Sequence, residues 1–310
     1  MGYPIDGILL IDKHEGETSY GVVRKVKSAF GDSKAPKVGH AGTLDPFASG
    51  LLIILVGQGT KLSSFIMSEK KVYKATITLG VETDTLDPTG QVVKKSTVPD
   101  IRPAYIRKKA RKFVGEIEQT PPIFSAVRYK GTRAYKLARK GVKMDLKKRN
   151  VTVFSLGIIS IDLPDITIEV ICSGGTYIRS LASDLGRKLG TGAHLKSLRR
   201  QASGSFEAHH ALSSREILRK CHDSSLQNEI IPLRAALPGM GEIEVNSIFA
   251  RKIRNGYQPA WEEIAKDSSL ADCRDEYVKL VGEGGLVAIM KVKNSEGVGH
   301  GEVRIERVFS

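Results

Sequence analysis

One stretch decides how this chain folds: residues 39–52 read Gly39-His40-Ala41-Gly42-Thr43-Leu44-Asp45-Pro46-Phe47-Ala48-Ser49-Gly50-Leu51-Leu52, and the apolar residues 53–56 follow at once. The glycine-rich first half predicts a loop, and the apolar second half predicts a buried strand. His40 and Asp45 therefore stand five positions apart on a loop that a strand anchors. A carboxylate held in this way suits chemistry better than packing, although Asp45-Pro46 is also a common turn dipeptide.

The length and composition limit the classes of protein to which this chain can belong. The chain has 310 residues, 41% of them hydrophobic, and a formal net charge of +14 at pH 7. It is long enough for one substantial core and a second, smaller one, and its basic balance favours a polyanionic partner. Its longest apolar run, Leu51–Val56, is too short to cross a membrane. The first residues show neither region of a secretion signal, so we expect a cytoplasmic protein without membrane attachment.

The cysteines and histidines indicate neither a disulfide framework nor a metal. The three cysteines lie far apart without a C-x-x-C pair; they are Cys172, Cys221 and Cys273. His209, His210 and His222 lack further ligands at a metal-binding spacing. We therefore expect no metal site.

The positive charge is concentrated in one segment. Between Pro121 and Asn150 stand ten cations and a single anion, Asp145. The cations are Arg128, Lys130, Arg133, Lys136, Arg139, Lys140, Lys143, Lys147, Lys148 and Arg149. Such a cluster repels itself unless phosphates neutralise it, so it favours binding of a nucleic acid over the alternative of a solvated basic helix.

Apolar patterning predicts the main elements. We expect strands over residues 8–11, 51–56, 72–79, 91–93, 151–161 and 166–172, and helices over 19–30, 60–66, 103–113 and 177–189. Strands and helices do not alternate regularly, and several strands are neighbours in sequence. The pattern therefore indicates an α+β fold around a mixed or antiparallel sheet.

The C-terminal quarter has a different character. Residues 232–239, Pro-Leu-Arg-Ala-Ala-Leu-Pro-Gly, are the best candidate for a linker. A short helix is expected over 247–254, followed by strands over 277–281, 286–293 and 303–309. Short strands with glycine turns predict a small β-rich accessory domain.

Residues 39–52 match the pattern Gly-His-x-Gly-Thr-Leu-Asp-Pro-x-Ala-x-Gly-x-Leu throughout. This stretch resembles the catalytic signature of the TruB family of pseudouridine synthases. The resemblance covers about residues 5–236. It implies a catalytic domain over 1–236 with a thumb insertion over about 121–150, and a PUA-like RNA-binding domain over 237–310. It also implies isomerisation of uridine 55 in the TΨC loop of tRNA, without a cofactor or an obligatory protein partner, and we expect a monomer.

Three residues are expected to carry the chemistry. In the family the signature aspartate acts at the target nucleotide, which assigns to Asp45 a part in cleaving the N-glycosidic bond. A buried cation is needed to keep such a carboxylate ionised. Arg179 is our candidate, since cations are not favoured in the first turn of a helix, and the family pairs the arginine of its Gly-Thr-Tyr-Ile-Arg motif with this aspartate. Tyr73, otherwise a core tyrosine, matches the family's tyrosine that stacks on the uracil and assists proton removal from C5.

The remaining candidates are expected to bind the substrate. The resemblance implies that His40 stacks into the RNA where the flipped base had been. Lys13 matches a Lys-Pro-x-Gly-x-Thr-Ser element in which this chain has His14 for the proline. Lys61 is expected to contact a phosphate or the pocket. Tyr177 and the thumb residues Arg128, Lys130 and Arg133 complete the set, and the thumb is expected to be mobile until RNA binds.

Three other functions fit parts of the sequence. A guide-dependent pseudouridine synthase shares the signature, but that class lacks the thumb. A non-catalytic RNA chaperone would need only the basic surface, with Asp45 incidental. A DNA-binding protein fits the charge equally well but not the catalytic signature.

Overall fold

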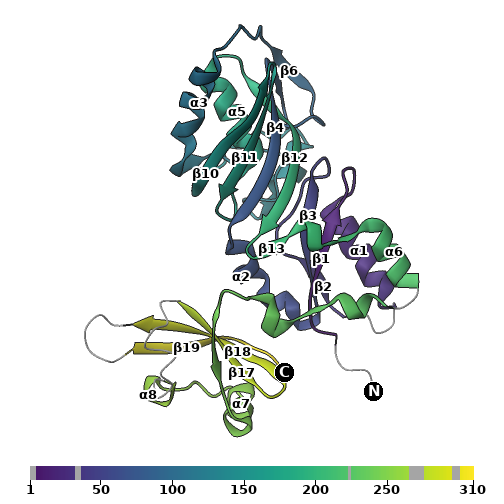
Figure 1. The fold of residues 1–310 in the computed structure, drawn as a ribbon, viewed down its shortest axis with the longest axis vertical. Helices are drawn as coiled ribbons and strands as arrows, with labels where there is room; N and C mark the ends of the chain where they lie inside the picture. The colour runs from purple at the N-terminus through teal and green to yellow at the C-terminus, as the bar shows by residue number, and fades with distance from the viewer. Residues whose placement is uncertain (1–4, 32–35, 223–224, 265–275, 295–300) are drawn as a thin grey trace.

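The computed structural model describes residues 5–31, 36–222, 225–264, 276–294 and 301–310. Within these residues, 11 strands form one mixed sheet with the main order β14-β1-β3-β12-β4-β11-β10-β7. The β1–β14 and β12–β3 pairs are parallel, and the other neighbours along this order are antiparallel. Figure 1 shows this sheet along the long axis of the molecule, with a second, smaller sheet at the lower end. The predicted α+β class is confirmed.

The bounds of the elements follow. The main sheet contains β1 (Gly7–Lys13), β2 (Val38–His40), β3 (Ser49–Val56), β4 (Lys71–Leu79), β7 (Gly115–Gln119), β10 (Arg149–Asp162), β11 (Asp165–Cys172), β12 (Ala193–Ser203), β13 (Phe206–Glu207), β14 (Leu212–Ser213) and β15 (Ile231–Pro232). Two small hairpins pair β5 (Val81–Thr83) with β6 (Val92–Lys95), and β8 (Arg128–Tyr129) with β9 (Thr132–Arg133). The helices are α1 (Ser19–Ala29), α2 (Ser63–Ser68), α3 (Pro103–Ala110), α4 (Ala134–Ala138), α5 (Ile178–Leu189), α6 (Ser214–His222), α7 (Ser247–Arg254) and α8 (Trp261–Ile264).

Strand β3 is buried on both of its faces. Leu52, Ile54 and Val56 join the core that α1, α3 and α5 cover, whereas the alternate residues 51, 53 and 55 join a second core on the opposite face. A strand with two buried faces needs apolar residues at every position rather than at every second one. This is why the decisive stretch ends in an unbroken apolar run, and why its loop is firmly anchored.

The helix ends agree with the sequence pattern. The Thr18 hydroxyl accepts a hydrogen bond from the amide of Gly21 at the start of α1. Helix α5 ends at Gly190, whose φ of 82° is the left-handed conformation that favours glycine. The expected helix over 60–66 is displaced: residues 57–62 form a 3₁₀ turn, and the α-helix begins only at Ser63. No helix in the described part of the chain is long and apolar enough to span a membrane.

Strand β12 was not predicted from the sequence, although it lies at the centre of the sheet. It pairs with β4 along most of its length and with β3 at Arg199 and Arg200. The segment carries Lys196, Arg199 and Arg200 among small residues, so its apolar alternation is weak. Pairing on both edges imposes the extended conformation, which is a tertiary effect.

The C-terminal sheet has the order β16-β17-β18-β19, from β16 (Gly241–Glu244), β17 (Tyr277–Gly282), β18 (Gly285–Asn294) and β19 (Gly301–Val308). It has its own apolar core, and it also packs on the main sheet through Leu286, Ile289 and Phe309. The predicted small β-rich unit is therefore present. The domain boundary at residues 236 and 237 stays a prediction.

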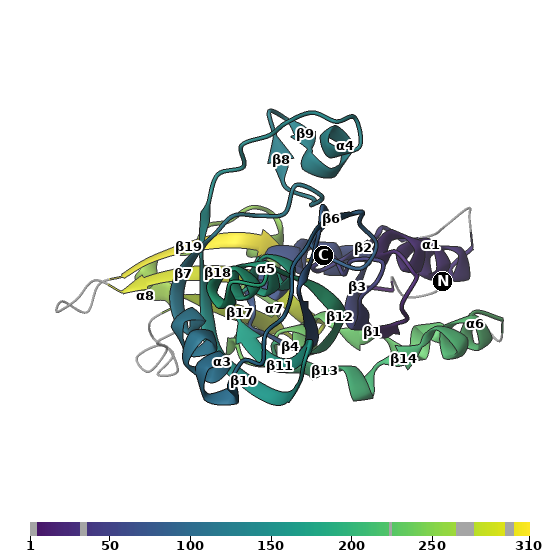
Figure 2. The ribbon, with the colours of Figure 1, turned by 90° about the horizontal axis from the view of Figure 1, so that it is seen from above.

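The basic segment forms an arm. Figure 2 shows β8, β9 and α4 standing away from the body of the molecule. The arm is closed by backbone hydrogen bonds from Ala134 to Val127 and from Tyr135 to Ser125. The arm lies within residues 121–150, whose assignment as a thumb insertion stays a prediction.

Candidate active site

The loop that carries Asp45 is fixed from several sides. The hydroxyl of Ser19, at the start of α1, donates to the carbonyl of Leu44 at 2.8 Å and accepts from its amide at 2.9 Å. The ammonium of Lys13, fully buried in β1, donates to the carbonyls of His14, Glu17 and Pro46. The loop thus holds Asp45 in place without using the Asp45 carboxylate itself.

Arg179 lies against Asp45, although 134 positions separate them in sequence. Its Nε is 2.9 Å from Asp45 Oδ2, and its Nη2 donates to Asp45 Oδ1 at 3.3 Å. The arginine side chain is 3% exposed and the aspartate side chain 32% exposed. The expected proximity of these two residues is observed: one hydrogen bond and one further close ion-pair contact join the guanidinium to the carboxylate.

The same guanidinium binds three further acceptors, which lie in two other segments of the chain. Its Nη1 donates to the carbonyl of Thr85 at 2.9 Å and to Asp87 Oδ2 at 3.1 Å. Its Nη2 donates to the carbonyl of Phe124, at the base of the arm, at 2.9 Å. Asp87 is buried and also accepts from Thr89 and Thr85. Arg179 therefore stands between two carboxylates and cannot turn away from Asp45 without losing several bonds.

The electrostatic environment of Asp45 differs from the expectation in one respect. Burial raises the pKa of the Asp45 carboxyl above its ordinary value, and nearby Asp87 adds to this, although Arg179 and Lys13 oppose it. The arginine was expected to keep the carboxylate ionised; it offsets the burial only in part. An ionised Asp45 is therefore a more basic group than an aspartate in water.

Asp45 and Arg179 form one wall of a cavity of about 480 Å³. Tyr73, Leu198 and Ile178 give it an apolar part, while Arg128 and Arg133 approach from the arm. A cavity of this volume accommodates a nucleotide-sized ligand, with cations on the side from which phosphates would enter.

Two paired strands supply a further part of the lining. Tyr73 of β4 is the cross-strand partner of Arg200 of β12. Burial raises the pKa of the Tyr73 phenol, while Arg200 acts to lower it. The Lys71 ammonium donates to three carbonyls at the end of α2, and burial lowers its pKa to about 8.

Two of the predicted substrate contacts are corrected. Lys13 is 0% exposed and all its donors engage carbonyls, so it shapes the loop instead of touching a ligand. Lys61 is not part of the cavity wall: its Nζ donates to the carbonyl of Val308 and lies over the ring of Phe309. Sequence spacing alone could not reveal that the C-terminal strand reaches this lysine.

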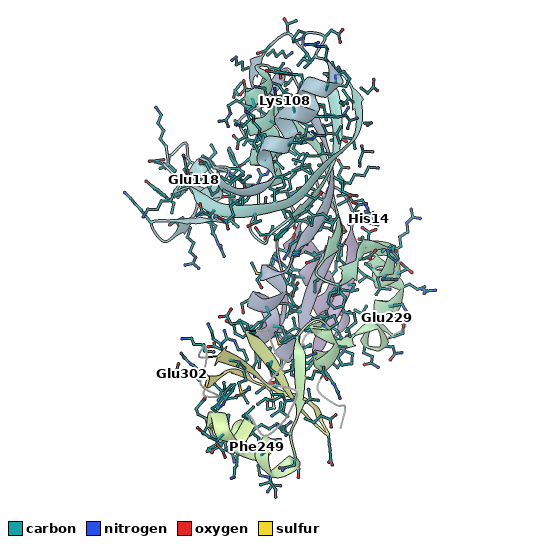
Figure 3. All side chains as sticks on the ribbon, turned by 60° about the vertical axis from the view of Figure 1, so that its left-hand side comes forward. His14, Lys108, Glu118, Glu229, Phe249 and Glu302 are labelled. Atoms are coloured by element: carbon teal, nitrogen blue, oxygen red, sulfur yellow. The ribbon has the colours of Figure 1, made fainter. Side chains whose placement is uncertain are left out.

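Of the other expected contacts, Tyr177 lines the cavity, with the guanidinium of Arg149 5.2 Å from its ring centre. His40, on β2, is not among the lining residues. Its buried Nδ1 has no hydrogen-bond partner within the described residues, and burial lowers its pKa. Lys130 lies on the arm, outside the cavity wall, in an adjoining basic hollow. Figure 3 shows the arm projecting from the sheet close to Glu118, well away from Lys108 on α3.

Several residues of the site were not predicted from the sequence. Asp87 and Lys71 were not predicted as site residues, and Arg200 lies in the strand that was not predicted. Gln119 exchanges two hydrogen bonds with the backbone of Tyr177 and so fixes the start of α5. The one signal in the sequence that could have found these residues was a charged residue in a segment whose apolar pattern is weak. The side chain of Cys221 and the whole of Cys273 lie outside the described residues.

Comparison with known sequences identifies the class of this protein. The profile described as TruB family pseudouridylate synthase (N terminal domain) matches residues 27–178. The profile described as tRNA pseudouridylate synthase B C-terminal domain matches residues 179–238. Together the two matches contain Asp45, Tyr73 and Arg179. The class is therefore the pseudouridine synthases.

Individual relatives narrow the class to a family. The tRNA pseudouridine synthase B of Geotalea uraniireducens (strain Rf4) is 38% identical over 287 residues, which covers 93% of this chain and 92% of the relative. That of Syntrophus aciditrophicus (strain SB) is 40% identical over 314 residues, with 98% and 99% covered. The chain belongs to the TruB family of pseudouridine synthases.

Solved structures share the fold at lower sequence identity. A crystal structure of a Cbf5–Nop10–Gar1 complex matches with a TM-score of 0.72 and 23% identity, covering 99% of this chain and 88% of that one. An archaeal box H/ACA sRNP Nop10–Cbf5 complex matches with a TM-score of 0.69, covering 100% and 91%. At this identity the likeness concerns the fold alone.

Proposed function

We propose that this protein converts uridine 55 in the TΨC loop of tRNA to pseudouridine, without a cofactor. The observation that carries the proposal is the contact of Arg179 with Asp45 at the wall of a cavity of nucleotide size. The names of the relatives, tRNA pseudouridine synthase B, support tRNA as the substrate. We further propose a monomer that acts in the cytoplasm without an obligatory partner, with catalysis in residues 1–236 and a PUA-like RNA-binding domain over 237–310.

In the proposed reaction the target nucleotide leaves its stack and enters the cavity. Asp45 acts at the sugar, the bond between C1′ and N1 breaks, and the uracil turns so that C5 bonds to C1′. Tyr73 packs on the base and assists removal of the C5 proton. His40 fills the space left in the RNA, and Tyr177, Arg128, Lys130 and Arg133 hold the surrounding nucleotides through stacking and phosphate contacts.

The isolated protein tests the proposal directly. It is incubated with a bare TΨC stem-loop, and modified uridines are mapped by primer extension. We expect pseudouridine at position 55 without any guide RNA or second protein. Activity that appears only when a guide RNA is added would replace this proposal with a guide-dependent synthase. Tight binding with no isomerisation would leave the chaperone alternative.

The raised pKa of Asp45 predicts the pH dependence of the reaction. Asp45 must be ionised to act at the sugar, and burial raises its pKa. The single-turnover rate should therefore fall on acidification at a pH above the ordinary range of aspartate, about 3.5–4. Arg179→Lys should move this acidic limb to higher pH, because a lysine makes one contact where the guanidinium makes two. A rate that stays constant down to pH 4 would contradict the assignment.

The arm predicts the salt dependence of RNA binding. We expect the triple change Arg128→Gln, Lys130→Gln and Arg133→Gln to weaken binding of the stem-loop. The slope of log K against log[salt] should fall by about 2–3 if each cation meets a phosphate. The control removes three charges from α3 and the residues that flank it, by Arg102→Gln, Lys108→Gln and Arg111→Gln. Equal slopes for the two triple variants would show that the arm has no special part in binding.

A further inference from the structure

Arg200 is a buried cation at the cavity, and it has no ion pair with a carboxylate in the described part of the chain. Its side chain is 2% exposed; Nε donates to the carbonyl of Leu51 at 2.6 Å and Nη2 to that of Gly42 at 3.2 Å. Among the described residues, no carboxylate forms an ion pair with it. A buried charge is costly unless something compensates for it. The compensation can come from a ligand that gains negative charge in the cavity.

Arg200 does not belong to the connected group that Asp45, Arg179 and Asp87 form, although it donates to the carbonyl of Gly42 on the Asp45 loop. Its place on β12 is opposite Tyr73 of β4. Lys71, two residues before Tyr73 on β4, adds a second cation on this side of the same cavity. A nucleotide whose ribose meets Asp45 and whose base packs on Tyr73 would therefore place the base, not the sugar, beside Arg200.

We propose that Arg200 stabilises the negative charge that the uracil base acquires when its bond to the ribose breaks. This inference rests on the proposed function. The electron pair of the C1′–N1 bond passes to the base and spreads over N1, O2 and O4. C1′ is meanwhile satisfied either by a bond to the Asp45 carboxylate or by loss of a C2′ proton. When C5 bonds to C1′ the electrons return, and the C5 proton leaves to a base.

A substrate with a better leaving group tests this role. The 5-fluoro substituent withdraws electrons, so the anion of 5-fluorouracil needs less stabilisation than that of uracil. TΨC stem-loops with uridine or 5-fluorouridine at the target are compared under single-turnover conditions, and loss of the parent nucleoside is followed after digestion. Two variants are used: Arg200→Gln, whose amide can still bind a loop carbonyl, and Arg200→Lys, which keeps the charge.

We expect Arg200→Gln to slow cleavage of uridine by about 100-fold or more, the usual effect of removing one stabilising donor. Its effect on 5-fluorouridine should be at least about 10-fold smaller by the same reasoning. Arg200→Lys should stay closer to wild type with both substrates. The matched control is Arg199→Gln on the same strand. The guanidinium of Arg199 donates two hydrogen bonds to the Asp12 carboxylate, so this change should leave both rates nearly unchanged.

Two results would overturn the inference while leaving the proposed function intact: equal slowing of both substrates by Arg200→Gln, or Arg200→Lys as slow as Arg200→Gln. Either would mean that Arg200 only positions the loop through Gly42 and Leu51. An inactive wild-type protein on the uridine stem-loop would instead overturn the proposed function, and this inference with it. Melting temperatures of the three variants separate loss of charge from loss of fold.

Discussion

Asp45→Asn should abolish isomerisation, with a loss of at least about 10⁴-fold, comparable to removing the reacting group of other enzymes. The asparagine keeps the shape of the side chain but provides neither a nucleophile nor a negative charge at the sugar. The measurement is tritium release from C5-labelled uridine in the TΨC stem-loop. Release at the wild-type rate would show that Asp45 has no catalytic part.

Binding and stability should survive the same change. Burial raises the pKa of Asp45, so its ionised form costs folding free energy at neutral pH, and this cost shrinks as the pH falls. The neutral asparagine should therefore not lower the melting temperature, and removing an anion from the cavity should not weaken RNA binding. Asp162→Asn, at an exposed position outside the cavity, is the matched control and should leave both activity and binding unchanged.

Arg179→Met should have the second largest effect, because it acts on activity and on stability together. It leaves Asp45 without its partner and Asp87, whose side chain is 6% exposed, as an uncompensated buried charge. Removing one member of a buried ion pair costs about 3–5 kcal/mol. We expect a loss of this size in urea unfolding at pH 7 and a rate reduced by more than about 100-fold.

The control for this prediction lies on the same helix. Arg187 is exposed and pairs with Asp184, so Arg187→Met should cost less than about 1 kcal/mol and leave the rate unchanged. An Arg179→Met protein as stable as wild type would show that the ion pair of Arg179 with Asp87 does not contribute to stability. One as active as wild type would remove Arg179 from the proposed chemistry.

The proximity of Asp45 and Arg179 could be predicted because a motif carries the information for each residue, whereas their catalytic roles stay predictions. Asp45 and Arg179 were paired because each stands in a recognisable local pattern, and the structure brings them into contact. Lys13 and Lys61 were also chosen from their local position in the sequence. Lys13, however, is buried and donates to carbonyls of the loop, and Lys61 binds the C-terminal strand. A lysine near a motif says nothing about what its long side chain reaches, since that depends on distant segments.

The sequence by itself determined the elements whose periodicity is strong: the doubly buried strand β3, the alternating strand β4, and the helix α5 that ends at Gly190. Only the tertiary structure decided the role of β12, because pairing with β3 and β4 makes a strand of a segment without clear alternation. Arg200 and Asp87 enter the site through such long-range pairing. Local patterns record burial along one element, whereas the charges that face one cavity are set by how separate elements meet.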